Sequence, residues 1–111
     1  QNRIVQFLDK EKSWRDPDFS IQDLINKTGI TRKELSNAIQ EMGYDNFPHY
    51  LNTLRVNDFT STLAHGKFDS FQNLFFEVGF RSRATAHRNF KQVTGESPSE
   101  YFAKIRQKGV K

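Results

Sequence analysis

Cationic and protonatable side chains crowd one short segment of this sequence. Five of the eleven residues from position 81 to position 91 can carry a positive charge: Arg81, Arg83, His87, Arg88 and Lys91. Phe90 and Val93 keep an apolar spacing through the same segment. Guanidinium and ammonium groups donate hydrogen bonds to phosphates and to guanine edges, so this segment suits a polyanionic partner.

Charge is distributed unevenly along the 111 residues. The chain has a formal net charge of +4 and a pI near 9.5. Residues 1–46 hold seven Lys/Arg and eight Asp/Glu (net −1), whereas residues 47–111 hold ten and five (net +5). The second half is therefore the stronger candidate for contacts with phosphate groups.

Nothing in the sequence predicts catalytic or metal-binding chemistry. The chain has no cysteine, which excludes disulfides, thiolate metal ligands and a thiol nucleophile. His49, His65 and His87 are scattered and lack carboxylates at the spacing of a metal site, and no glycine-rich phosphate loop or nucleophile elbow occurs. We therefore predict no enzymatic activity, no catalytic or metal-ligating residues and no cofactor.

The elements that position the basic segment are predicted to be helices. No stretch alternates in the way of a strand, and no Asn-Gly or Asp-Gly hairpin turn is present. A hydroxyl residue precedes an acid by three positions, as in helix N-terminal caps, at Ser20 with Asp23, Thr31 with Glu34 and Ser97 with Glu100. We predict helices over residues 3–13, 20–27, 31–42, 46–64, 70–78, 82–94 and 98–107.

Two of the predicted connections repeat one pattern. Gly29-Ile30-Thr31 and Gly79-Phe80-Arg81-Ser82 each join two short helices, as in a helix-turn-helix unit. A shift of about 51 residues places Ile39 on Phe90 and Tyr50 on Tyr101, which indicates two copies of one unit. The predicted fold is all-α with about seven helices: a first helix-turn-helix subdomain (1–46), a linker helix (47–64) and a second subdomain (65–111).

The predicted linker helix has apolar residues on two opposite faces. At 100° per residue, one face carries Phe47, Tyr50, Leu51 and Leu54, and the other carries Val56, Phe59 and Leu63. Such a helix is expected to contribute to two separate cores. The alternative is an irregular amphipathic helix within a single bundle.

The predicted helices 31–42 and 82–94 each combine an apolar face with a polar face. The apolar faces consist of Leu35, Ala38, Ile39 and Met42 in the first helix and of Ala86, Phe90 and Val93 in the second. The polar faces consist of Lys33, Ser36, Asn37 and Gln40, and of Ala84, His87, Arg88 and Lys91, which correspond under the same shift. A helix fits the major groove of DNA, where Arg or Lys donates to guanine and Asn or Gln pairs with adenine. For either helix alone, the alternative is a polar face that only contacts solvent. Because the same arrangement occurs in both helices, we favour contact with DNA.

The sequence also resembles a known family. The segment "FFEVGFRSRATAHRNFKQVTGESPSEYF" is similar to the second helix-turn-helix of AraC/XylS-type bacterial transcription regulators, and "IQDLINKTGITRKELSNAIQEMGYDNFPHYLNTLRV" is similar to the first. The resemblance covers about residues 15–106. It implies sequence-specific binding of double-stranded DNA by two recognition helices in successive major-groove segments.

By motif position, the resemblance also implies which residues contact DNA. The implied base contacts are Lys33, Ser36, Asn37 and Gln40 in one helix and Arg83, Ala84, Thr85, His87 and Arg88 in the other. We expect phosphate contacts from Arg32, Arg81, Lys91 and Lys104.

The sequence departs from this family at three core positions. Ile25 and Phe75 each lie four residues before a turn glycine, where the family usually has a small alanine. Ala86 stands where the family usually has a bulky aromatic residue. We hypothesise that Phe75 fills the volume that residue 86 vacates, because cores tolerate exchanges that conserve volume.

The resemblance implies partners beyond DNA. The chain begins at Gln1, and we expect it to be a fragment of a bacterial cytoplasmic protein, nucleoid-associated when bound. That protein is expected to have a separate sensor or dimerisation domain and to contact RNA polymerase. We expect no membrane segment here, since no apolar run approaches about 20 residues. The alternative function is a helical protein-interaction module with a basic face for an acidic partner.

Overall fold

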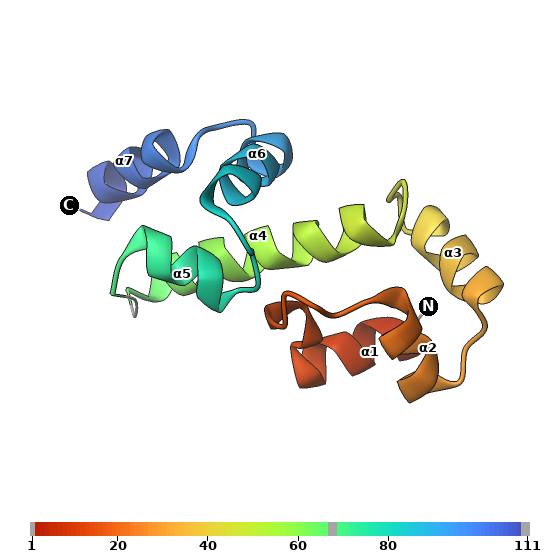
Figure 1. The fold of residues 1–111 in the computed structure, drawn as a ribbon. Coiled ribbons are helices and arrows are strands. Elements are labelled where there is room, and N and C mark those ends of the chain that lie inside the picture. The colour runs from red at the N-terminus through yellow and green to blue at the C-terminus, as the bar shows by residue number, and fades with distance from the viewer. Residues whose placement is uncertain (1, 67–68, 110–111) are drawn as a thin grey trace.

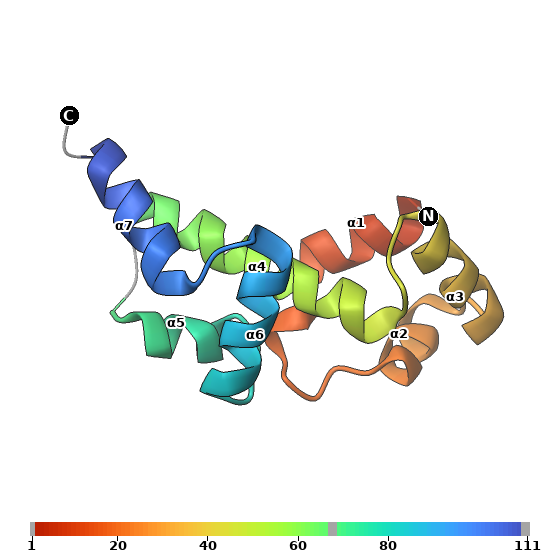
Figure 2. The ribbon, with the colours of Figure 1, turned by 90° about the horizontal axis from the view of Figure 1, so that it is seen from above.

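The computed structural model describes residues 2–66 and 69–109, which form seven α-helices, one short 3-10 helix and no strand. In chain order they are α1 (Asn2–Glu11), η1 (Ser13–Arg15), α2 (Ile21–Thr28), α3 (Arg32–Glu41), α4 (Phe47–His65), α5 (Phe71–Glu77), α6 (Arg83–Thr94) and α7 (Pro98–Gly109). Helix α4 runs through the middle of the molecule, with α1 to α3 along its first half and α5 to α7 along its second (Figures 1 and 2). The all-helical prediction is confirmed, and only η1 was not predicted.

Side-chain caps begin the helices where the sequence predicts them. Ser20 accepts a hydrogen bond from the Asp23 backbone N–H, while the Asp23 carboxylate accepts one from the Ser20 N–H. Thr31 with Glu34 and Ser97 with Glu100 form the same reciprocal pairs. The first predicted helix runs two residues too far, because Lys12 takes a left-handed conformation (φ 50°) and ends α1 before η1.

Two clusters of buried side chains meet along α4. The first cluster consists of Ile4, Leu8, Trp14, Phe19, Leu24, Leu35, Ala38, Ile39, Phe47, Tyr50 and Leu51. The second cluster consists of Val56, Phe59, Leu63, Leu74, Phe75, Val78, Phe80, Ala86 and Phe90. The prediction that α4 contributes its opposite faces to two cores is confirmed. The boundaries of the two subdomains at residues 46 and 65 stay a prediction.

Aromatic rings fill the second cluster. The ring of Phe59 stacks on that of Phe75 with centroids 4.3 Å apart, and Phe90 meets Phe59 edge-on at 5.4 Å. Phe75 and Ala86 are both buried in this cluster, as the hypothesised volume exchange requires. Ile25, the matching departure in the first unit, is half-buried against the first cluster.

The prediction that Val93 lies on the buried face of α6 is wrong. Its side chain is 37% exposed. It borders a hollow shared with Tyr44 and His49, so the last turn of α6 faces a polar loop at this level. The apolar spacing along a helix predicts which of its faces is buried, but it does not show how far along the helix other parts of the protein cover that face.

Candidate nucleic-acid interface

Helix α3 presents a polar face because its apolar face is anchored in the first cluster. Leu35, Ala38 and Ile39 are buried. The structure therefore leaves the predicted base-contact residues of this helix at the surface: Lys33, Asn37 and Gln40 are exposed and Ser36 is half-buried.

The first turn of α3 carries a fixed negative charge. Hydrogen bonds from the side chain and the backbone of Thr31 hold the pKa of Glu34 below its ordinary value. Glu34 follows directly after Lys33 in this turn. The first turn of α3 therefore carries a carboxylate next in sequence to Lys33, the only cation among the predicted base contacts of this helix.

Helix α6 presents a more basic face. It begins at the Ser82 cap, whose hydroxyl donates to Thr85 Oγ1 (2.9 Å) and accepts from the Thr85 backbone N–H (3.2 Å). Arg83, Ala84 and Arg88 are exposed. The Thr85 hydroxyl already takes part in the cap, so the polar group of this predicted base contact is engaged within the protein.

His87 and Arg88 lie beside the start of the next helix. The His87 ring is half-buried, with its centroid 5.4 Å from that of Phe75. A hollow of about 470 Å³ separates α6 from the N-terminus of α7, and His87, Arg88, Lys91, Gln92, Ser97 and Pro98 line it. The structure thus brings three predicted DNA-contacting residues of α6 to one concave surface.

Three of the four predicted phosphate contacts have partners within the protein. Arg81 forms an ion pair with Asp18, and Lys104 Nζ lies 2.7 Å from Glu96 Oε1. Arg32 Nη2 donates to Gln22 Oε1 at 3.1 Å. The hydrogen bond to Glu96 also raises the pKa of Lys104. Lys91, the fourth, is exposed.

The ends of the two candidate recognition helices approach a common hollow of about 460 Å³. One wall comes from the segment after α3 and the start of α4, with Gly43, Tyr44, Asp45, His49 and Thr53. The other wall comes from α6, with Asn89, Gln92 and Val93. This hollow lies between α6 and the segment that joins α3 to α4, and the sequence did not predict it.

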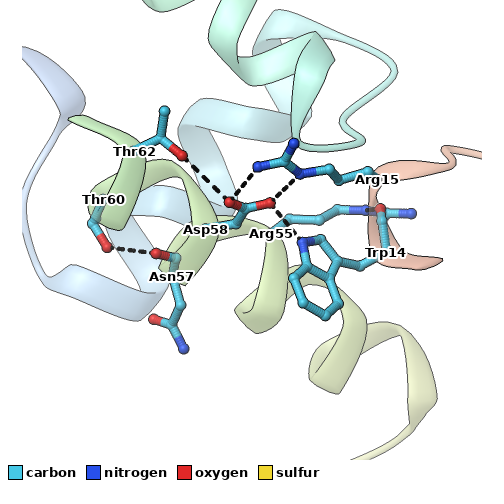
Figure 3. A network of polar contacts seen from close by, with 7 residues as sticks. All are labelled: Trp14, Arg15, Arg55, Asn57, Asp58, Thr60 and Thr62. Atoms are coloured by element: carbon cyan, nitrogen blue, oxygen red, sulfur yellow. Dashed lines mark hydrogen bonds and ion pairs between the residues drawn. The ribbon is translucent and has the colours of Figure 1, made fainter. Parts of the chain in front are cut away.

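A polar network joins the first part of the chain to α4, as Figure 3 shows. The Asp58 carboxylate accepts hydrogen bonds from Trp14 Nε1 (2.8 Å), Arg15 Nε (2.6 Å) and Arg15 Nη2 (2.8 Å). Buried Arg55 donates from Nε to the Trp14 carbonyl (2.7 Å) and from Nη2 to the Asp16 carbonyl (3.1 Å). We call Trp14, Arg15, Arg55 and Asp58 the clasp.

The clasp shifts the ionisation of its charged groups. Burial alone would raise the pKa of Asp58, but the hydrogen bonds from Arg15 and Trp14 outweigh it and hold that pKa below its ordinary value. The hydrogen bond to Asp58 raises the pKa of Arg15. Burial lowers the pKa of Arg55.

The sequence did not predict the clasp. The available signal was a charged residue, Arg55, placed where the two apolar faces of α4 meet between Leu54 and Val56.

Among residues 2–66 and 69–109, no group of His, Cys, Asp and Glu side chains is arranged to hold a metal ion. Within the same ranges, no helix has the length and apolar character needed to cross a membrane.

Comparison with known proteins identifies the family. The family model described as "Helix-turn-helix domain" matches residues 24–104, a span that runs from α2 to α7. The chain belongs to the AraC-type helix-turn-helix family. This is a family of DNA-binding transcription regulators, so DNA binding is the function that membership supports for this domain.

Curated relatives and one solved structure agree with this assignment. An uncharacterized HTH-type transcriptional regulator of Staphylococcus aureus is 29% identical over 84 residues, which cover 76% of this chain, and the same figures hold for a regulator from strain MSSA476. The chain matches only 11% of the length of these relatives. A solved structure of a protein with unknown function from Listeria innocua superposes with a TM-score of 0.72 and 27% identity, covering 92% of this chain and 93% of that one.

Proposed function

We propose that this AraC-type domain binds double-stranded DNA at specific sequences, with α3 and α6 as recognition helices in successive major-groove segments. One observation carries the proposal: two capped helices of one repeated unit each bury an apolar face and expose a polar one. Family membership supplies the ligand class.

The chemistry of the two faces supports different kinds of base contact. Asn37 and Gln40 on α3 can each pair with the N6 and N7 edge of adenine, and Arg88 on α6 can donate both its terminal N–H groups to guanine O6 and N7. Lys91 and Arg81 are placed on or next to α6, where they can neutralise phosphates. We propose that the second unit supplies most of the phosphate contacts.

Selection of bound duplexes from a random pool tests this proposal. We expect a site of two short conserved segments about one helical turn (roughly 10 base pairs) apart, because the two helices read separate stretches of groove. The double variant Arg83→Ala/Arg88→Ala should lose preference in one segment only. The matched control Lys10→Ala/Lys27→Ala also removes two cations, from exposed positions on α1 and α2, and should retain both segments.

A protein-binding module would give a different result. Its basic face would retain no random duplex DNA at low salt, and no sequence would be enriched. That outcome would favour an acidic protein partner and contradict DNA binding by this domain.

We also propose that the domain works within a longer bacterial cytoplasmic regulator that contacts RNA polymerase. The support is that the curated relatives are much longer than the segment that matches this chain, and that they are named as transcriptional regulators. The additional length can hold a sensor or dimerisation domain. Co-purification of the full-length protein with RNA polymerase on its selected DNA site, compared with DNA alone, tests this proposal.

A further inference from the structure

We propose that the clasp residues Trp14, Arg15, Arg55 and Asp58 are positioning residues that hold the two helix-turn-helix units at one relative angle. By doing so they set the spacing between the two DNA segments that the domain accepts. The second statement rests on the proposed function, whereas the first concerns the protein alone.

Helix α4 by itself is a weak determinant of that angle. It is a single helix of 19 residues whose two ends belong to different clusters. Long helices curve, and a small bend in the middle of α4 would rotate one unit against the other. A second connection that bypasses the helix backbone would restrict this motion.

Arg55 provides one part of that second connection. Its side chain is buried, and its guanidinium donates to the backbone carbonyls of Trp14 and Asp16. A buried cation without hydrogen-bond acceptors is strongly unfavourable, so these carbonyls must remain in place. Because the acceptors are backbone atoms, Arg55 fixes the path of the chain after α1 and not merely one side chain.

Asp58 provides the other part. Its side chain is 7% exposed and receives four hydrogen bonds: two from the Arg15 guanidinium, one from the Trp14 indole and one from the Thr62 hydroxyl. Asp58 directly precedes Phe59, whose ring lies at the centre of the second cluster. Segment 14–16, which comes before the first helix-turn-helix, is thereby tied to the part of α4 that belongs to the second unit.

The turn of the second helix-turn-helix rests on the same segment. Gly79 has φ +115°, and a Cβ atom there would lie 2.1 Å from the Trp14 carbonyl oxygen and 2.7 Å from Arg55 Nε. The Arg55 guanidinium also lies over the Phe80 ring, 6.0 Å from its centre. The ion pair between Arg81 and Asp18 adds an exposed link beside it. The turn that leads into α6 therefore contacts the first part of the chain directly.

Distance measurements on the 111-residue chain test the angular restraint without DNA. Because the chain has no cysteine, spin labels can be attached uniquely at Lys27→Cys on α2 and Asn73→Cys on α5, both exposed. We expect one narrow distance distribution in the parent and a broader or shifted one after Arg15→Gln or Asp58→Asn. The control Ile4→Val perturbs the first cluster but leaves the clasp intact and should keep the narrow distribution.

Spacing selectivity tests the consequence for DNA. Insertion of one base pair between the two segments of the selected site moves them apart by about 3.4 Å and rotates them by about 34°. We expect the parent to discriminate against the inserted site, and the variants Arg15→Gln and Asp58→Asn to reduce that discrimination by about fivefold, since members of one hydrogen-bonded network couple by amounts of this order. Gly79→Ala, which pushes the turn away from Trp14, should reduce it as well.

The outcomes separate this inference from the proposed function. A parent that selects no two-segment site contradicts the proposed function, while the distance distributions still decide whether the clasp restrains the angle. Variants that keep the parent's narrow distribution and its spacing selectivity would overturn the inference. Lower stability with unchanged distance distribution and spacing selectivity would assign the clasp a purely structural role and would also overturn it.

Discussion

The two helix-turn-helix units share a backbone plan and differ in what they place inside it and on its face. Each cluster holds four aromatic side chains, but those of the first are of three types (Trp14, Phe19, Phe47 and Tyr50), whereas those of the second are all phenylalanine (Phe59, Phe75, Phe80 and Phe90). Both units begin their candidate recognition helix with a hydroxyl cap and place a glycine in the turn before it. Caps and turn glycines therefore define the unit, and core and surface can vary independently around them.

We expect the difference in charge to give the two units different parts in DNA binding. Residues 47–111 carry a net +5 and residues 1–46 a net −1. Phosphate contacts contribute affinity regardless of sequence, while base contacts discriminate between sequences. We expect the second unit to supply most of the salt-dependent affinity and the first to contribute mainly selectivity.

The largest effect is expected from the second core. Phe59→Ala removes a ring that contacts Phe71, Phe75 and Phe90, and it should lower the free energy of unfolding by about 3–5 kcal/mol. Urea unfolding measures this loss. The matched control Phe76→Ala removes a ring that is 43% exposed and should change the free energy of unfolding by less than about 0.5 kcal/mol.

Hydrogen exchange on Phe59→Ala then shows how far the two cores are independent. If the clasp joins the units firmly, protection in α1 to α3 should fall together with protection in α5 to α7. Full protection in α1 to α3 would contradict such coupling and would mean that each core folds alone.

The next largest effects are expected from Arg88 on α6 and Asn37 on α3, and they distinguish the polar faces of these two helices. Arg88→Ala should weaken binding to the selected site by about 1–3 kcal/mol, relax the preference at one base pair and reduce the salt slope. Asn37→Ala should relax preference at another base pair and leave the salt slope unchanged, because Asn carries no charge. Fluorescence anisotropy with selected and scrambled duplexes, at several salt concentrations, measures both quantities.

The charge-matched control for Arg88→Ala is Lys27→Ala, an exposed cation at the end of α2. Lys27→Ala should alter neither the base-pair preference that Arg88→Ala relaxes nor the one that Asn37→Ala relaxes. Equal losses on selected and scrambled duplexes after Arg88→Ala would assign Arg88 to phosphate and remove it from base reading.

Local signals explain how much could be predicted from the sequence. The pairs Ser20 with Asp23 and Thr31 with Glu34 lie three residues apart and act within one turn of helix, so the sequence alone placed the helix starts. The apolar spacing of Phe47, Tyr50 and Leu51 likewise defined a face of α4. These features depend only on neighbours along the chain.

Contacts between distant segments were not predictable in the same way. Asp58 meets Arg15 across 43 positions, and the carbonyl acceptors of Arg55 have no side-chain signature at all. Val93 was misplaced for a related reason, since its exposure depends on a loop about half a chain away. The base and phosphate contacts remain predictions, because they depend on the path of DNA over the protein.

A smaller effect concerns the connection between the units. Asp58→Asn should lower the free energy of unfolding at neutral pH by about 1–2 kcal/mol, because Arg15 and Trp14 lose a charged acceptor. The folded-state pKa of Asp58 lies below its ordinary 3.8, so its stabilising contribution is present above about pH 4 and is lost as the pH falls through the lowered value. Urea unfolding at several pH values should therefore show parent and variant converging in acid.

The control for this titration is Asp9→Asn, which removes an exposed carboxylate from α1. Its stability should follow that of the parent at every pH. A difference between parent and Asp58→Asn that stayed constant into acid would show that the carboxylate charge is not what the clasp uses.

The smallest effect tests whether Asp18 of the first unit weakens phosphate binding by Arg81 of the second unit. Arg81 is a predicted phosphate contact that forms an exposed ion pair with Asp18, and phosphate must compete with that carboxylate. Asp18→Asn should strengthen binding to any duplex by a few-fold at most, since exposed ion pairs contribute about 0.2–1 kcal/mol.

Asp9→Asn removes the same charge without releasing Arg81 and should give a smaller gain. Adding Arg81→Ala to Asp18→Asn should abolish the gain. If the gain survives in that double variant, it arises from net charge, and the two units act on phosphate independently.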